Sequence, residues 1–138
     1  MRIPDDFLYY LSAHEDCSER LLLRAKDLSA EDLEVSTDAE IMHIRKMVQA
    51  VLTEVHRMEA FVRLRPLGSH VLYGYLKPRH KIGDIICDFF ARRNPQTIVV
   101  LGNGHESWIS LHHGGKILRK RGTKMTETLE QLKSFFNC

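Results

Sequence analysis

Residues 54–77, Glu-Val-His-Arg-Met-Glu-Ala-Phe-Val-Arg-Leu-Arg-Pro-Leu-Gly-Ser-His-Val-Leu-Tyr-Gly-Tyr-Leu-Lys, decide the fold, because the spacing of their apolar residues changes from helical to alternating. The helical spacing begins upstream with a capping box from Thr37 to Glu40, and with Asp38 in the first turn, where the helix dipole favours negative charge. Apolar residues then recur at three- and four-residue intervals, at Ile41, Ile44, Val48, Val51, Val55 and Met58. This single stripe predicts a long amphipathic helix that packs against the rest of the chain.

The second half of the stretch predicts a β-hairpin. From Ala60 onward the residues alternate between the two faces of a strand, so we expect one strand over residues 60–65 and another over residues 71–76. Pro66, Gly68 and Ser69 supply the turn between them. Lys77-Pro78 ends the second strand, because proline has no N–H to donate to a neighbouring strand.

Outward from this stretch, the same two periods predict the remaining elements. Upstream we expect short helices over residues 5–15 and 18–28, and a further turn that starts at a capping box on Ser29. Downstream we expect, in order, a helix over 80–93, strands over 97–101, 106–111 and 116–119, and a helix over 123–136.

N-terminal helices are thus followed by a β-β-α-β-β(-β)-α unit. No strand-helix-strand repeat runs through the chain, which predicts an α+β fold with a mainly antiparallel sheet. At 138 residues the length indicates a single domain over 1–138. Within it we expect a helical part over 1–59, and a sheet with its covering helices over 60–138.

The composition disfavours several classes of protein. No apolar run approaches the ~20 residues of a membrane helix, and the first residues lack the basic flank and apolar stretch of a secretory signal. The three cysteines are far apart and form no Cys-x-x-Cys pair, so we expect reduced thiols in a cytoplasmic protein and no structural zinc. His112 and His113 point to opposite faces if extended and, like His105, have no carboxylate pattern nearby, so no metal site is expected. No phosphate loop, nucleophile elbow or dinucleotide fingerprint is present, and no cofactor is expected.

The net charge of +2 conceals a separation of charge along the chain. Residues 1–56 contain six Lys or Arg and twelve Asp or Glu, whereas residues 57–124 contain thirteen Lys or Arg and four Asp or Glu. The net charges of these two segments are therefore −6 and +9. A strongly basic segment is typical of a surface that faces a polyanion such as DNA. It is equally consistent with acidic helices that lie over a basic sheet and neutralise it.

The basic residues form two groups that are candidates for binding nucleic acid. In the first group, arginines suited to phosphates and tyrosines suited to stacking on unpaired bases are expected to share one face of the hairpin: Arg63, Arg65, Tyr73, Tyr75 and Lys77. The alternative is that the first helices cover this face and pair its arginines with acids. The second group lies in a segment without acids, where exposed cations attract polyanions by counterion release: Lys116, Arg119, Lys120 and Arg121. Arg57, Arg92 and Arg93 complete the candidate set.

His56 is the candidate for acid–base chemistry in the opening stretch. Glu54 and His56 are two residues apart on a helix, so their side chains diverge rather than pair. We therefore expect His56 and Arg57 to anchor the junction between helix and strand by hydrogen bonds. A catalytic role for His56 requires a partner from elsewhere in the chain.

Three segments carry a resemblance to a known family: Glu54-Val55-His56-Arg57-Met58-Glu59-Ala60-Phe61-Val62-Arg63, Leu72-Tyr73-Gly74-Tyr75-Leu76-Lys77-Pro78 and Phe89-Phe90-Ala91-Arg92-Arg93. Over residues 40–112 the chain resembles a bacterial and archaeal domain of unknown function that is described as a probable DNA metabolism protein. Members of that family are linked to a DNA-modification radical-S-adenosylmethionine (radical-SAM) protein and are sometimes fused to a uracil-DNA glycosylase-like domain. The resemblance implies a cytoplasmic protein of DNA repair or modification that acts with a partner, and it assigns no catalytic residue.

We therefore expect a nucleic-acid-associated accessory protein in DNA repair or modification that is non-catalytic by itself. Its expected partners are DNA and a radical-SAM or glycosylase-like protein, and no membrane. Two alternatives stay open. The first is an interaction module that docks on an enzyme partner through the hairpin or the last helix. The second is a small enzyme that acts on a phosphorylated substrate through His56 and nearby arginines.

Overall fold

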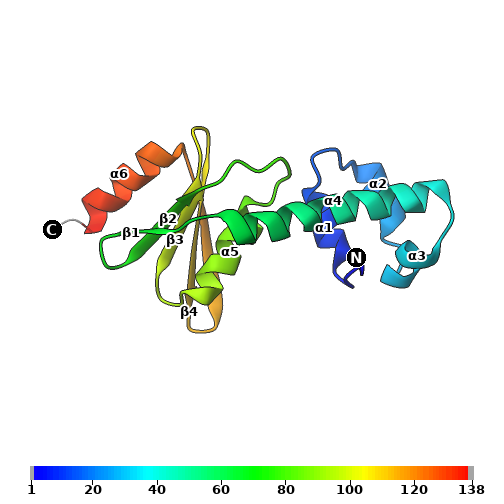
Figure 1. The fold of residues 1–138 in the computed structure, drawn as a ribbon, viewed down its shortest axis with the longest axis horizontal. Helices are drawn as coiled ribbons and strands as arrows, with labels where there is room; N and C mark the ends of the chain where they lie inside the picture. The colour runs from blue at the N-terminus through cyan, green and yellow to red at the C-terminus, as the bar shows by residue number, and fades with distance from the viewer. Residues whose placement is uncertain (1, 137–138) are drawn as a thin grey trace. The chain divides into compact units, whose positions relative to one another are not determined.

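The chain forms two compact units (Figure 1). The helical unit comprises Met1–His56 and Arg79–Lys81, and the sheet unit comprises Arg57–Pro78 and Ile82–Cys138. The structure is a computed structural model, and the residues it describes are 2–136. Within this range, no helix combines the length and the apolarity that crossing a membrane requires.

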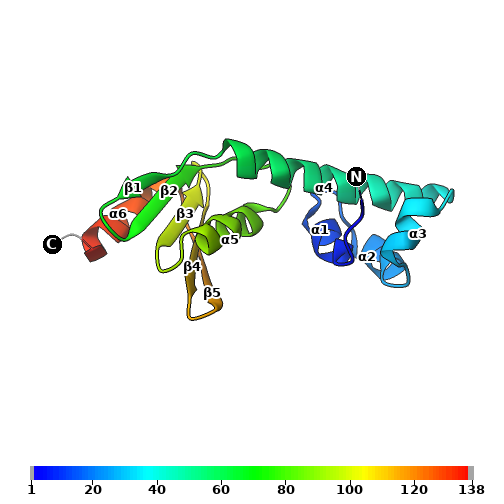
Figure 2. The ribbon, with the colours of Figure 1, turned by 60° about the horizontal axis from the view of Figure 1, so that its bottom comes forward.

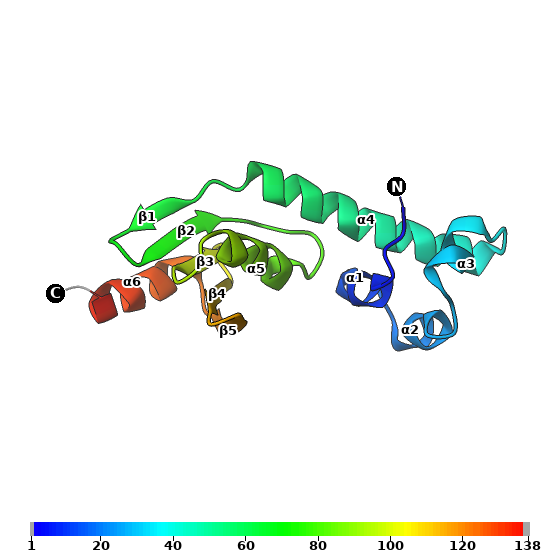
Figure 3. The same cartoon turned by 90° about the horizontal axis from the view of Figure 1, so that it is seen from below.

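The helical unit is built on one long helix. Its elements are α1 (Phe7–Ala13), α2 (Glu19–Ala25), α3 (Ala30–Val35) and the larger part of α4 (Ala39–Phe61). The three short helices lie along α4 (Figure 3), and the predicted stripe from Ile41 to Val55 is buried. Ile3, which precedes α1, and residues of all four helices form this core: Phe7, Leu11, Leu21, Ala25, Leu33, Ile41, Ile44, Met47, Val48 and Leu52. The capping box that the sequence predicts on Ser29 is confirmed.

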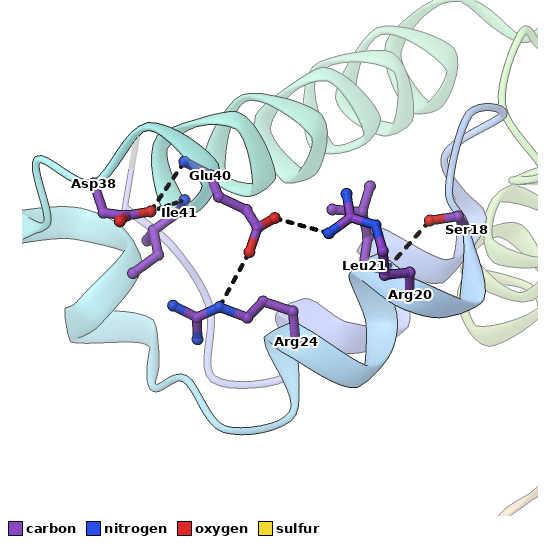
Figure 4. A network of polar contacts seen from close by, with 7 residues as sticks. All are labelled: Ser18, Arg20, Leu21, Arg24, Asp38, Glu40 and Ile41. Carbon is purple, nitrogen blue, oxygen red and sulfur yellow. Dashed lines mark hydrogen bonds and ion pairs between the residues drawn. The ribbon is translucent and has the colours of Figure 1, made fainter.

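The start of α4 differs from the prediction. Asp38, rather than Thr37, caps the helix, since its Oδ1 accepts the backbone N–H groups of Glu40 and Ile41 at 3.0 and 3.2 Å. The Glu40 carboxylate turns to α2, where it binds Arg20 at 2.9 Å and Arg24 at 3.1 Å (Figure 4). The predicted Thr37–Glu40 capping box is therefore wrong, because two guanidinium groups occupy the carboxylate.

The change from helix to strand also comes later than predicted. α4 continues to Phe61, and the N–H of Val62 still donates to the carbonyl of Met58 at 2.9 Å. The predicted strand over 60–65 is wrong, because residues 60 and 61 belong to α4 and make their backbone hydrogen bonds within the helix. β1 is the short strand Arg65–Leu67, with Pro66 inside it rather than in the turn. An edge strand tolerates proline where the missing N–H faces solvent.

The sheet unit contains five strands in the order β1-β2-β3-β4-β5. After β1 its elements are β2 (Val71–Tyr75), α5 (Gly83–Arg93), β3 (Ile98–Gly102), β4 (Ser107–His113), β5 (Lys116–Gly122) and α6 (Met125–Phe136). Three pairings are antiparallel, whereas β2 and β3 are parallel, because α5 carries the chain back between them. The predicted α+β fold with a mainly antiparallel sheet is confirmed.

The two helices that follow β2 cover opposite faces of the sheet. On one face, which we call the α5 face, the Ser110 hydroxyl donates to Asp88 of α5 at 2.7 Å. Figure 2 shows α5 beside β3 and β4. On the other face, the α6 face, Met125 and Leu129 of α6 pack with Val71 and Val100. Both faces of the central strands are therefore buried.

Residues 79–81 leave the sheet unit and form part of the helical unit. The backbone N–H groups of Arg79 and His80 donate to the two carboxylate oxygens of Glu54 at 2.7 and 2.9 Å. The N–H of Lys81 donates to the carbonyl of Ala13 at 2.8 Å. These bonds hold the backbone of residues 79–81 outside a helix, so α5 begins at Gly83 and not at His80 as predicted.

Candidate nucleic-acid interface

β5 brings four of the candidate cations onto one edge of the sheet. Lys116, Arg119, Lys120 and Arg121 are all exposed along this seven-residue strand. Lys120 is paired with Ile109 and therefore lies on the α6 face. Lys116, four residues earlier on the same strand, lies on that face too. Arg119 and Arg121 lie on the α5 face. The strand thus presents cations on both faces of the sheet.

Carboxylates of α5 hold the two arginines of β5. The carboxylate of Asp88 is buried, and its Oδ2 accepts Arg119 Nε at 2.7 Å and Nη2 at 2.5 Å. Arg121 lies 3.6 Å from the carboxylate of Asp84 in an exposed pair. The two pairs are in register because two strand residues rise ~6.6 Å and four helical residues rise ~6 Å. Lys116 and Lys120, by contrast, have no acidic partner within residues 2–136.

The hairpin group is split by the structure. Arg65 is the cross-strand partner of Tyr73, so both lie on the α6 face. Tyr73 is half-buried against the core under α6, whereas Tyr75 is 61% exposed, and their rings meet edge to face at 6.2 Å between centroids. Arg63 lies between α4 and β1, and Lys77 follows β2. The expectation that all five residues share one strand face is therefore wrong, although Arg63, Arg65, Tyr75 and Lys77 are all exposed.

One rung of the sheet connects the two groups. Arg65, Tyr73, Val100, Ile109 and Lys120 are successive partners from β1 to β5. Cations stand at both ends of this rung, about 19 Å apart at the backbone if strands are ~4.8 Å apart. The α6 face therefore has positive charge at both edges and aromatic or apolar side chains between them.

The other candidate arginines lie outside these groups. Arg92 and Arg93 are exposed in the last turn of α5, where the helix dipole favours cations. The Arg93 guanidinium lies 4.6 Å from the centre of the Phe89 ring, within the range of a cation–π contact. Arg57 is exposed on α4.

A groove of about 640 Å³ lies between α6 and the outer strands of the sheet. Ile109, Leu111 and Leu118 form its floor, and Leu132 and Phe135 of α6 form a wall. Its remaining lining residues are Ile98, Arg119, Lys120, Arg121, Gly122, Thr123, Thr128 and Gln131, and of the three cations Lys120 has its side chain on this face of the sheet. Leu118 and Phe135 are 58% and 79% exposed, which is unusual for large apolar residues. Sequence reasoning missed this groove, because it depends on where α6 crosses the sheet.

The side chain expected to anchor the junction between α4 and β1, His56, forms no such anchor among the described residues, and Glu54 anchors a different segment. His56 is exposed on α4, and its side chain makes no hydrogen bond or ion pair within the described part of the chain. Glu54 instead receives the two backbone N–H groups of residues 79 and 80. A cue was present in the sequence, since Glu54 is the single acid between Glu40 and Glu59.

Two histidines that the sequence did not bring together meet in the helical unit. The rings of His14 and His80 are 4.3 Å apart between centroids, and both side chains are buried. His14 Nδ1 accepts the N–H of Asp16 at 3.0 Å, and His80 Nδ1 accepts the N–H of Glu15 at 3.1 Å. An accepting Nδ1 requires the neutral ring with its proton on Nε2. Burial lowers the pKa of His14, and the repulsion that would arise if both His14 and His80 were charged lowers it further.

Burial raises the pKa of both described thiols, Cys17 and Cys87. Cys87 is buried, and burial raises the pKa of its thiol to about 12, so the thiolate is scarce at neutral pH. Among residues 2–136, no three His, Cys, Asp or Glu side chains lie close enough to hold a metal ion. Cys138 lies outside the described residues.

The chain matches a protein-family model over most of its length. The model of DUF4130, a domain of unknown function, matches residues 13–137, and the chain therefore belongs to this family. A search of curated proteins and a search of solved structures found no match.

Proposed function

We propose that this member of the DUF4130 family is a nucleic-acid-associated accessory protein of DNA repair or modification, non-catalytic by itself, which binds DNA through β5. The observation that carries the proposal is the row of cations on this edge strand, in which Lys116 and Lys120 are exposed and have no acidic partner within the described residues. Phosphate contacts of this kind supply most of the affinity of sequence-independent binding.

The hairpin edge adds to the same proposal. Arg63 and Arg65 are exposed and form no ion pair within residues 2–136, and Tyr75 offers an exposed ring on which an unpaired base can stack. The expected DNA-modifying or glycosylase-like partner would supply the chemistry. The family resemblance and the basic segment of +9 support this reading over that of an enzyme built on His56.

The test is binding to a fluorescently labelled single-stranded oligonucleotide of about 20 nucleotides, followed by anisotropy from roughly 50 to 200 mM salt. Affinity should fall steeply with salt. The Lys116→Gln, Lys120→Gln double variant removes two phosphate contacts and should lower the slope of log affinity against log salt by about 1.4. Arg63→Ala with Arg65→Ala should weaken binding further.

A matched control separates a site from a general effect of charge. Lys26→Gln with Lys46→Gln removes the same two charges from exposed positions of the helical unit and should leave the affinity nearly unchanged. The proposal fails if the wild-type chain does not bind at ~50 mM salt, where phosphate contacts are strongest. It also fails if both double variants lose affinity equally.

A further inference from the structure

The sheet unit leaves one strip of its α6 face uncovered. Five strands at ~4.8 Å spacing make a sheet about 19 Å wide, and one helix with its side chains is about 10 Å across. The buried side chains of α6, Met125 and Leu129, pack with Val71 of β2 and Val100 of β3. The strip over β4 and β5 is therefore about one helix wide, and it forms the floor of the 640 Å³ groove.

The floor of this groove is a small patch of four side chains on two neighbouring strands. Leu111 is paired with Leu118, and Ile109 is paired with Lys120, so the patch is three apolar residues and one cation. Neighbours along each strand are ~6.6 Å apart, close to the 5–6 Å between residues three or four apart on a helix. The patch therefore matches the spacing of the apolar anchors of an amphipathic helix, as in helix-in-groove recognition.

The charges of the lining select the kind of helix. Lys120 presents its side chain to the groove, and the described lining contains no acidic residue. The carboxylates that engage Arg119 and Arg121 belong to α5, on the opposite face, whereas Lys120 has no acidic partner within residues 2–136. A partner helix with acidic residues flanking its apolar stripe would find a complementary cation here.

We propose that this groove docks an acidic amphipathic helix of a partner protein, which lies beside α6 over β4 and β5. Leu118 and Phe135 would be covered by its apolar stripe, and its carboxylates would face Lys120. The inference does not require DNA binding, and it concerns a different ligand from the one proposed above.

The probe is a labelled 16-residue peptide of Leu, Glu and Ala, with Leu at i, i+3, i+4 and i+7 positions and Glu beside them. It should bind the chain saturably in fluorescence anisotropy, at least tenfold more tightly than a peptide of the same composition with the stripe shuffled. Leu118→Ser should weaken it about tenfold, because an exposed leucine is buried on binding. Leu118 is exposed, so this variant should fold; Leu23→Ser, at an exposed leucine of α2, is the matched control and should bind like the wild type.

A charge exchange tests the specificity. Lys120→Glu should weaken binding of the acidic peptide and should strengthen binding of the version with Lys in place of Glu.

Equal binding of the original and the shuffled peptide, or an equal loss of affinity in Leu118→Ser and Leu23→Ser, overturns the proposal. A dimer in light scattering that Leu118→Ser dissolves assigns the groove to a second copy and overturns it too. If Leu118→Ser loses oligonucleotide binding but keeps peptide binding, the groove binds nucleic acid and the docking proposal is wrong. If the chain binds the peptide but no DNA, only the function proposed above is wrong.

Discussion

Replacing Arg119 by methionine tests what holds β5 in place. Asp88 is 2% exposed, and its carboxylate receives the Ser110 hydroxyl and the Arg119 guanidinium. Without Arg119, Ser110 is the remaining partner of Asp88 among these contacts. Breaking a buried ion pair from one side costs ~3–5 kcal/mol. Because the Arg119 side chain is 53% exposed, solvent screening reduces this cost, and we expect a loss of about 2 kcal/mol in the free energy of unfolding.

The assay is urea unfolding followed by the fluorescence of Trp108, the single tryptophan of the chain, which is buried in the same unit. Arg121→Met is the matched control. Arg121 lies two residues further along the same face, and its pair with Asp84 is exposed and 3.6 Å long. This variant should change the free energy of unfolding by less than about 0.5 kcal/mol.

A double-mutant cycle isolates the pair itself. Asp88→Asn keeps the shape of the side chain and removes its charge, and combined with Arg119→Met it should show a coupling energy of about 1–2 kcal/mol. If Arg119→Met and Arg121→Met destabilise the chain to within about 0.5 kcal/mol of each other, burial of Asp88 does not decide the strength of the pair, and the reasoning is refuted.

Two further predictions concern packing and pH. A Cβ on Gly83 would overlap the indole of Trp108, so Gly83→Ala should lower the free energy of unfolding in urea by about 2–3 kcal/mol, despite the better helix propensity of alanine. Gly104→Ala, where a Cβ would lie in open space, is the control and should be nearly neutral. A stabilised Gly83→Ala variant would contradict the packing. The pKa of His14 is lowered in the folded chain, so the unfolded chain binds more protons near pH 6, and stability should be full above about pH 6.5 and fall as the pH drops below it. Circular dichroism melts at pH 7.5 and 5.5 should show this loss, and His14→Asn, which keeps an acceptor near the position of Nδ1 without titrating, should reduce it; an unchanged melting temperature would refute the role of the buried neutral ring beside His80.

Much of the fold was predictable because its signals are local. The stripe from Ile41 to Val55 is buried as predicted, since a helix brings residues three and four apart onto one face whatever surrounds it. The capping box on Ser29 needs only its own turn. The strand over Val71–Tyr75 was recognisable from alternation and from the proline that follows.

The candidate site was predictable only as a composition. The basic segment marked β5 and the hairpin, but it did not separate Arg119, which a buried carboxylate of α5 holds, from Lys120, which is exposed at the groove. The two are neighbours in sequence and point to opposite faces. Which face receives α5 and which receives α6 is set by the crossover between β2 and β3.

By itself, the sequence determined the periods, the caps and the charge of each segment of this protein. Only the tertiary structure decided which partner each polar group takes: Glu40 binds arginines of α2 rather than its own helix terminus, and Glu54 binds residues 79 and 80. The physical reason is range. Periodicity and capping act within one or two turns, whereas a carboxylate binds whichever cation or N–H the packing of distant segments brings within about 3 Å of it.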